Sequence, residues 1–222
     1  MDVMNVTPMV LGSVICKFML PMQIIDEINT SYDEGKDQLR PLNKQLAGKI
    51  KEENLVNDIL SESIKMTFIE CFAEYTKHIK KPFWGLSLSD AWINEMKAGE
   101  YNPLHYHSSP QSDLGMSSVL VLKTPSTYGE EFSNPQDPSN GYLEFTGGNQ
   151  DPLGISNFRT NAQVGEFYVF PYTMLHCVYP FNGTDEVRRT LSQNCDLLKL
   201  TSNIKNMAKS VERLDSVISE EK

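Results

Sequence analysis

Apolar residues recur at helical spacing in two segments of the first third of the chain. The first runs from Pro21, which suits a first helical turn, to Gly35, which can end a helix. The second begins after Ser61, a residue type that caps helices, and stops before Pro82. One apolar stripe marks this second segment: Ile64, Phe68, Phe72, Tyr75 and Ile79. The pattern therefore predicts two helices, separated by a polar stretch over 36–58 and preceded by a strand within 12–20.

From Trp84 onward the pattern changes to short runs rich in β-branched and aromatic residues. Clusters of Gly, Pro, Asn and Asp separate these runs, which are LSLSDAWIN, SSVLVLKTP, GYLEFTG, GEFYVFP and RRTLSQNCDL. No long helix alternates with them, which argues against a parallel sheet built from βαβ units. The sequence therefore predicts helices first and then a mainly β body, either a barrel or a sandwich.

The C-terminal tail returns to helical spacing. Apolar residues alternate steps of three and four at Leu197, Leu200, Ile204, Met207, Val211, Leu214 and Ile218. Such a seam serves either a helix packed on its own barrel or a homodimer formed through this helix. We therefore expect a single domain over 1–222, with a helical support region (1–83), a β core (84–196) and a C-terminal helix (197–222).

Composition and charge narrow the class of protein. No apolar run approaches the roughly 18 residues that a membrane span needs, and the N-terminus lacks the basic region of a signal peptide. We therefore expect a cytoplasmic protein that is neither secreted nor membrane-bound, with its four scattered cysteines as free thiols. A formal net charge of −9 argues against non-specific binding to nucleic acid.

Histidine is scarce, yet two of the four histidines stand one residue apart, at His105 and His107. On a strand, such residues point to the same face. His176 follows the predicted strand GEFYVFP, and a barrel could place it beside the other two. Three imidazoles from two strands make a facial site for a borderline metal such as Fe(II), Zn, Mn, Cu or Ni. The plainer alternative is unrelated histidines facing solvent.

Two residues are candidates for the third metal ligand. Facial sites of this kind in oxygenases use two histidines and one carboxylate, and the carboxylate position two residues after the first histidine holds His107 here. Asp113 lies nearby in the sequence and is the substitute if a loop carries it back to the site. We favour His107, because a strand aims it at the site without special geometry.

The last predicted strand, RRTLSQNCDL, contains a candidate anion site. Arg188 and Thr190 share one face of it, and Arg189 points the other way. An arginine with a hydroxyl two residues further on can hold a carboxylate by a bidentate fork plus one more donor. The alternative is that Arg188 is an ordinary surface arginine.

These residues resemble the phage-type 2-oxoglutarate and Fe(II)-dependent oxygenases and, more loosely, the prolyl 4-hydroxylase superfamily. The resemblance covers about residues 84–196 and rests on DAWINEMKAGEYNPLHYHSS, SSVLVLK, GYLEF and VGEFYVFPYTMLHCVYPFNGTDEVRRTLSQN. It implies a double-stranded β-helix, a jelly-roll or cupin-like barrel, supported by N-terminal helices and a C-terminal helix. By position, His105, His107 and His176 match the iron ligands. Arg188 and Thr190 match the residues that hold 2-oxoglutarate, and Asn94 is a weaker match.

The activity that this resemblance implies is hydroxylation of an unidentified substrate, a protein side chain or a small molecule. Fe(II), 2-oxoglutarate and O2 take part, and succinate and CO2 are co-products. No catalytic side chain beyond the metal ligands is implied. A phage-encoded chain would act in the host cytoplasm.

Two other functions compete with this one. Gly99, His105 and His107 also fit a sequence motif of the cupins. A cupin would be a metal-dependent dioxygenase or isomerase that does not use 2-oxoglutarate. The third possibility is a non-catalytic barrel that acts in binding or assembly. The turn-rich loop 126–141 is a candidate cover for the site, with Tyr128 and Phe132 as candidate substrate contacts.

Overall fold

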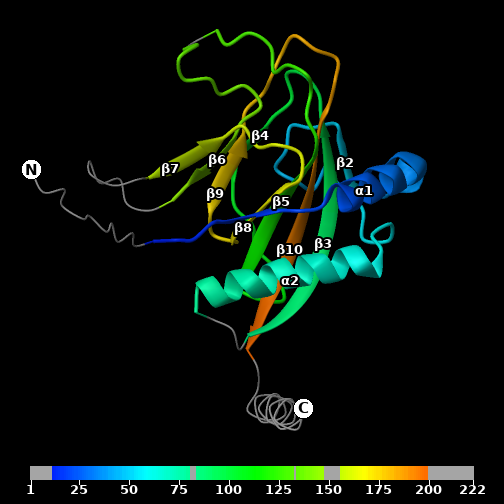
Figure 1. Ribbon diagram of the computed structural model, residues 1–222, viewed down its shortest axis with the longest axis vertical. Helices are drawn as coiled ribbons and strands as arrows, with labels where there is room; N and C mark the ends of the chain where they lie inside the picture. Colours follow the sequence, from blue (N-terminus) through cyan, green and yellow to red (C-terminus); the bar gives the residue numbers. More distant parts are fainter. Residues whose placement is uncertain (1–11, 81–83, 133, 148–155, 200–222) are drawn as a thin grey trace, which may run out of the picture.

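A computed structural model of the chain describes residues 12–80, 84–132, 134–147 and 156–199, which form two antiparallel sheets and two helices (Figure 1). The larger sheet holds, in spatial order, β1 (Cys16–Met19), β8 (Glu166–Pro171), β5 (Gly115–Lys123), β10 (Arg188–Lys199), β3 (Trp84–Met96) and β2 (Glu52–Leu55). The smaller sheet holds β4 (Asn102–His105), β9 (Leu175–Val178), β6 (Leu143–Thr146) and β7 (Asn157–Thr160). The predicted mainly β body is confirmed.

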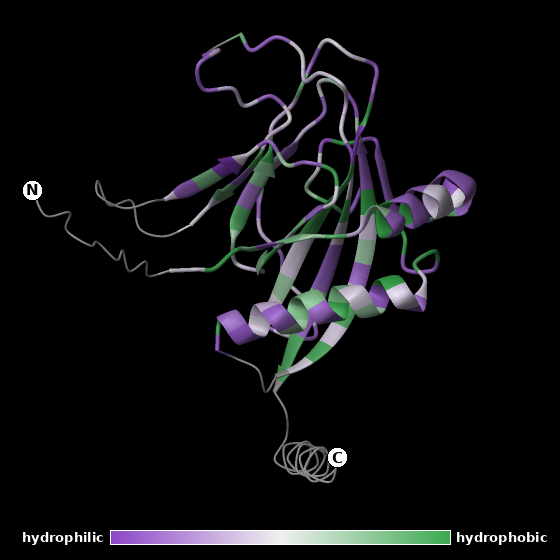
Figure 2. Cartoon of the chain, in the orientation of Figure 1, coloured by the Kyte–Doolittle hydropathy of each residue, from purple (hydrophilic) through white to green (hydrophobic). Residues whose placement is uncertain are grey.

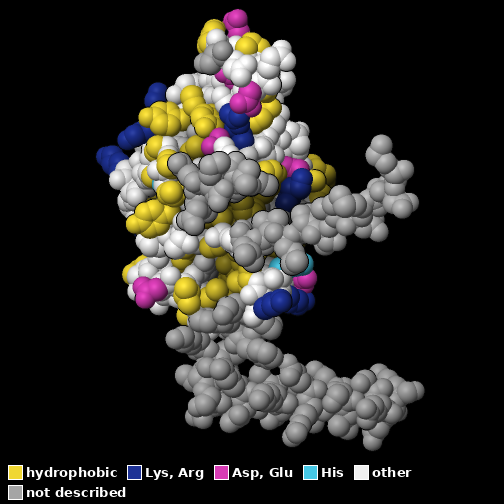
Figure 3. Space-filling view, turned by 90° about the vertical axis from the view of Figure 1, so that its left-hand side faces the viewer, with side chains coloured by type: hydrophobic (Ala, Val, Ile, Leu, Met, Phe, Trp, Pro, Cys, Tyr) yellow, Lys and Arg dark blue, Asp and Glu magenta, His cyan; other side chains and the backbone are white. Residues whose placement is uncertain are grey.

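Both predicted helices are present, as α1 (Met22–Gly35) and α2 (Glu62–His78), with a short 3-10 turn, η1 (Lys36–Gln38), after the first. The Ser61 hydroxyl accepts a hydrogen bond from the Ile64 N–H, which is the expected N-cap of α2. At the other end of α2, His78 is exposed. Figure 3 shows one face of the molecule, on which hydrophobic, basic and acidic side chains are interspersed. The two helices therefore begin and end where local sequence signals place them.

The helices cover the outer face of the larger sheet and build one of two cores. Phe68 of α2 stacks on Phe167 of β8 with ring centroids 5.2 Å apart, and Ile28 of α1 belongs to the same cluster. The second core fills the space between the two sheets and includes Val121 and Phe145. Figure 2 shows apolar colour along the central strands, which are covered on both sides.

Arg189 fastens α1 to the larger sheet, and its side chain points away from that of Arg188, as predicted. Its guanidinium donates to Asp33 at 2.6 Å, to Glu95 at 2.9 Å and to Asn29 at 3.0 Å. It also lies over the Tyr32 ring, 4.6 Å from the centroid. Since Arg189 is 2% exposed, this network is a buried connection between helix and sheet.

Two features depart from the sequence prediction. The segment 36–58 was expected to be a polar connection, but it contains β2, a short edge strand of the larger sheet. The last strand also runs past the expected boundary at 196: β10 stays paired with β3 as far as Lys199, and Leu197 is buried against the helix side. The predicted helix and dimer seam from residue 200 onward lie outside the described residues.

All four cysteines are free. Within the described part of the chain, no helix is long and apolar enough to cross a membrane.

Candidate metal centre and cosubstrate site

Three histidines converge at one end of the smaller sheet. His105 is the last residue of β4 and lies opposite His176 of β9 in the antiparallel register. His107 lies just beyond the end of β4, in the connection to β5, where its N–H donates to the Tyr172 carbonyl at 2.9 Å. Hence the strand places His105, as predicted, whereas a loop contact places His107.

The spacing of these imidazoles suits ligation of one metal ion. One ring nitrogen from each residue lies within 4.8 Å of the others, and the Nε2 atoms of His107 and His176 are 3.2 Å apart. Two nitrogens that bind one metal at about 2.1 Å are separated by about 3.0 Å at a right angle and about 3.4 Å at the tetrahedral angle. The observed separation therefore falls in the range that a shared ion requires.

The protonation of the cluster also favours a metal. Burial lowers the pKa of His105, lowers that of His107 well below its usual range, and lowers that of His176 to about 3. The Nδ1 atoms of His105 and His176 lie 2.7 Å and 3.0 Å from the carbonyl oxygens of Pro103 and Met174. As donors to these carbonyls, the two rings present an unprotonated Nε2 to the centre.

A buried carboxylate holds the loop that carries His107. Asp196 of β10 is 3% exposed and accepts hydrogen bonds from the Tyr172 hydroxyl and the Ser109 hydroxyl, each at 3.0 Å. Tyr172 in turn accepts the His107 N–H, and the Trp92 ring packs 5.7 Å from the His107 ring. The loop is thereby tied to the larger sheet at His107 and at Ser109.

The structure does not bring Asp113 into the histidine cluster. Asp113 is exposed, and the group of ligand atoms that could hold an ion consists of the three imidazoles alone within the described residues. The geometry therefore favours His107 over Asp113 as the third donor.

Arg188 provides the strongest sign of an anion site. It begins β10 and faces the space between the sheets, where it is 2% exposed. Its Nε and Nη2 have no hydrogen-bond partner among the described residues, and the hydroxyl of Tyr128 lies beside the guanidinium. A buried cation surrounded by unpaired donors is costly unless an anion accepts from them. A carboxylate supplies the acceptors that this end of the barrel lacks.

Thr190 and Asn94 lie next to Arg188 on the same inner face. Thr190 is two residues along β10, and Asn94 is its register partner on β3. Both are buried, and the Asn94 Oδ1 has no partner among the described residues. The predicted set of Arg188, Thr190 and Asn94 is thus brought together.

Arg188 and His176 belong to different sheets. Tyr128 is half-buried: its ring packs against Phe181, and its hydroxyl lies beside Arg188. The expected contact of Tyr128 with substrate stays a prediction. Phe132 in the same loop is 77% exposed. Whether the loop covers the site stays a prediction.

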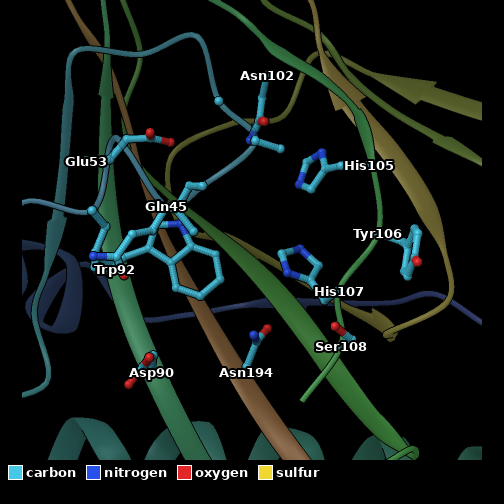
Figure 4. Close-up of a pocket in the computed structure, with 14 residues that line it drawn as sticks. Gln45, Glu53, Asp90, Trp92, Asn102, His105, Tyr106, His107, Ser108 and Asn194 are labelled. Atoms are coloured by element: carbon cyan, nitrogen blue, oxygen red, sulfur yellow. The ribbon is translucent and has the colours of Figure 1, made fainter. Parts of the chain in front are cut away.

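A pocket of about 400 Å3 opens beside the histidines. Figure 4 shows its walls: His105 and His107 on one side, the Trp92 ring across from them, and Glu53 and Asn102 further round. Sequence reasoning missed Trp92, although β alternation places it on the same face as Asn94. Glu53 and Asn102 carried no such signal, because β2 was not predicted and Asn102 precedes the histidines at an unremarkable position.

Comparisons with known proteins agree with this geometry. Residues 90–194 match the sequence model of a family described as "Putative 2OG-Fe(II) oxygenase". No curated protein matches the chain. Two similar structures are a prolyl-4-hydroxylase from Pseudomonas putida (14% identity, 84% of this chain and 93% of that one, TM-score 0.52) and the viral collagen prolyl hydroxylase of Paramecium bursaria Chlorella virus-1 with 2OG (13%, 83% and 96%, 0.53).

A third similar structure is a prolyl hydroxylase from Trichoplax adhaerens in complex with a peptide fragment of hypoxia inducible factor (11% identity, 82% of this chain and 83% of that one, TM-score 0.52). At these identities the structural likeness shows the fold alone. It confirms an arrangement of the two sheets like the double-stranded β-helix of prolyl 4-hydroxylases. None of the comparisons shows a phage origin.

Proposed function

We propose roles for individual residues of this chain, which belongs to the 2OG-Fe(II) oxygenases and is similar in fold to the prolyl 4-hydroxylases. The enzyme depends on Fe(II) and 2-oxoglutarate, as its family does. In our proposal, His105, His107 and His176 are the iron ligands. The observation that carries this assignment is the approach of their ring nitrogens to within 4.8 Å, with none of the three rings readily protonated.

The same proposal gives Arg188 the far carboxylate of 2-oxoglutarate. The guanidinium Nε and Nη2 are the unpaired donors, the Tyr128 hydroxyl lies beside them, and Thr190 adds a hydroxyl on the same face. Together these donors around one carboxylate orient the cosubstrate, so that its keto acid end is directed toward the histidines. Tyr128 is therefore an addition to the predicted set.

When bound, the iron with 2-oxoglutarate and O2 supplies the oxidising power for hydroxylation of a substrate C–H bond, with succinate and CO2 as co-products. The chain contributes position and environment. Trp92 and the apolar residues between the sheets keep water from the histidines, and the Asp196 network holds the His107 loop in place. A site of three neutral donors leaves the metal more positive than one with a carboxylate, which favours binding of the anionic cosubstrate.

An anaerobic titration tests these assignments. Protein with Fe(II) should develop a visible charge-transfer band on addition of 2-oxoglutarate. The band should be lost in His176→Ala and should need far more 2-oxoglutarate in Arg188→Ala. His78→Ala and Arg40→Ala, which alter an exposed histidine and an exposed arginine, are the matched controls. Metal binding with no response to 2-oxoglutarate would favour the cupin alternative, and no metal binding would favour the assembly protein.

A further inference from the structure

The pocket beside the histidines contains a carboxyl group that nothing in the structure neutralises. Glu53 of β2 is 1% exposed, and neither of its carboxyl oxygens has a hydrogen-bond partner among the described residues. Across the pocket, the Oδ1 of Asn102 is also buried without a partner. Figure 4 shows the Glu53 carboxyl directed from the β2 side toward Asn102. Unpaired acceptors in such a position are costly, so the Glu53 carboxyl and the Asn102 Oδ1 call for hydrogen-bond donors from a ligand.

The charged side chains among the described lining of the pocket, histidine aside, are all acidic. Its described lining includes two acidic residues, Glu53 and Asp90, and neither lysine nor arginine. Burial, and to a lesser extent the nearby carboxylate of Glu100, raises the pKa of Glu53 to about 7. The negative potential here favours a positively charged ligand, in line with the net charge of −9 for the whole chain.

The third wall of the pocket is aromatic. The indole of Trp92 faces the same space, and an aromatic face attracts an ammonium or a guanidinium group. A volume of about 400 Å3 has room for one long side chain or a small molecule. The histidines form the far side, so a ligand anchored at Glu53 would pass in front of the metal centre.

We propose that this pocket takes a substrate with a cationic nitrogen group, a guanidinium or a primary ammonium, and that Glu53 and Asn102 are its acceptors. The inference rests on the proposed function, since it assigns the substrate class of the same site. The cation supplies the missing N–H donors and the missing positive charge together, whereas a neutral amide supplies only the donors. Trp92 packs against the face of the cationic group or its aliphatic stem.

Entry to Glu53 requires a small movement of the loop that covers it. Gly48 lies directly on the carboxyl, because a Cβ built at Gly48 would collide with the Glu53 Oε1. Among the described residues, Ala47 and Gly48 make no hydrogen bond, whereas Leu46 and Lys49 on either side each donate one from the backbone. The two residues between these anchors can therefore shift while the rest of the loop stays in place.

Calorimetry at pH 8 with anaerobic protein, Fe(II) and 2-oxoglutarate tests the proposal. L-Arginine is compared with the nearly isosteric, neutral L-citrulline, and L-lysine with L-norleucine. An arginine peptide, acetyl-Gly-Arg-Gly-amide, and its citrulline counterpart distinguish a protein substrate from a free amino acid. We expect at least one cationic ligand to bind tenfold or more tightly than its neutral counterpart. Because this comparison uses the wild-type protein, it does not depend on how any variant folds.

The variants assign the preference to one residue. Glu53→Gln should abolish the preference for the cation, whereas Glu52→Gln, which alters the adjacent carboxylate bound to Lys97, should keep it. Equal binding of cationic and neutral ligands, absence of binding by both, or a preference retained in Glu53→Gln would overturn the proposal. The charge-transfer band of 2-oxoglutarate, recorded on the same samples, tests the proposed function separately, because the proposed function assigns no role to Glu53. Repeating the calorimetry without 2-oxoglutarate distinguishes failure of the substrate proposal from failure of the proposed function.

Discussion

Replacement of Glu53 by Gln should make the protein more stable at neutral and alkaline pH. The wild-type carboxyl is 1% exposed and has no hydrogen-bond partner among the described residues, so its charged form is strongly disfavoured in the folded state. The substitution keeps the shape of the side chain and removes the ionisable group. The expected gain is therefore a change in how stability depends on pH, rather than a change in packing.

The size of the effect follows from the pKa of Glu53, which burial and the Glu100 carboxylate raise from 4.5 to about 7. Below pH 4.5 the group is protonated in both the folded and the unfolded chain and costs nothing. As the pH rises to 7, the unfolded chain releases the proton and the folded chain keeps it, so stability falls. At about 1.4 kcal/mol for each pH unit, the wild type should lose about 3 kcal/mol over this window, with no further loss above it.

Urea denaturation at a series of pH values between 4 and 8.5 measures this difference. The free energy of unfolding of Glu53→Gln minus that of the wild type should rise by about 3 kcal/mol across the series and then level off. Glu27→Gln, a change of an exposed carboxylate on α1, is the control and should follow the wild type. If the curves of Glu53→Gln and the wild type stay parallel, the carboxyl is solvated or paired in solution, and the argument for an unneutralised group fails.

Three further outcomes are expected. His176→Ala should abolish retention of Fe(II) after anaerobic dialysis, as measured by metal analysis, and His78→Ala should not. Asp196→Ala should weaken Fe(II) binding, because the contacts with Tyr172 and Ser109 that hold the His107 loop are lost while all three proposed ligands remain. A competition titration measures the affinity, and an unchanged value would refute this role of Asp196. Arg189→Leu should lower the free energy of unfolding by about 3–5 kcal/mol in urea, because Glu95 is left as an uncompensated buried charge.

Features set by neighbouring residues could be predicted from the sequence. The capping Ser61 and the apolar stripe that follows it define α2, and β alternation correctly placed Arg188 and Arg189 on opposite faces of β10. The same alternation brought His105 to the site. In each case the signal lies within a few residues of the feature, so that local propensity and side-chain periodicity are sufficient.

Features set by distant contacts could not be predicted in this way. Strand β2 is an edge strand with the polar sequence EENL, and pairing with β3 alone makes it a strand. Tyr128 looked like an exposed loop residue, and only the packing against Phe181 turns it toward Arg188. The burial of Glu53 without a hydrogen-bond partner could not be predicted either, because it depends on residues that are distant in the sequence.

The two halves of the proposed site come from different sheets, so the core between the sheets sets their relation. The histidines belong to the smaller sheet and its exit loop, whereas Arg188 belongs to β10 of the larger sheet. Phe170 of the larger sheet packs 4.7 Å from the His176 ring and 4.9 Å from the Phe145 ring of the smaller sheet. Because close-packed aromatic rings resist displacement, these contacts hold the histidines and the guanidinium at a fixed separation. In the proposed function, this separation selects the cosubstrate by its length, and Glu53, on the edge strand β2, is proposed to select the substrate.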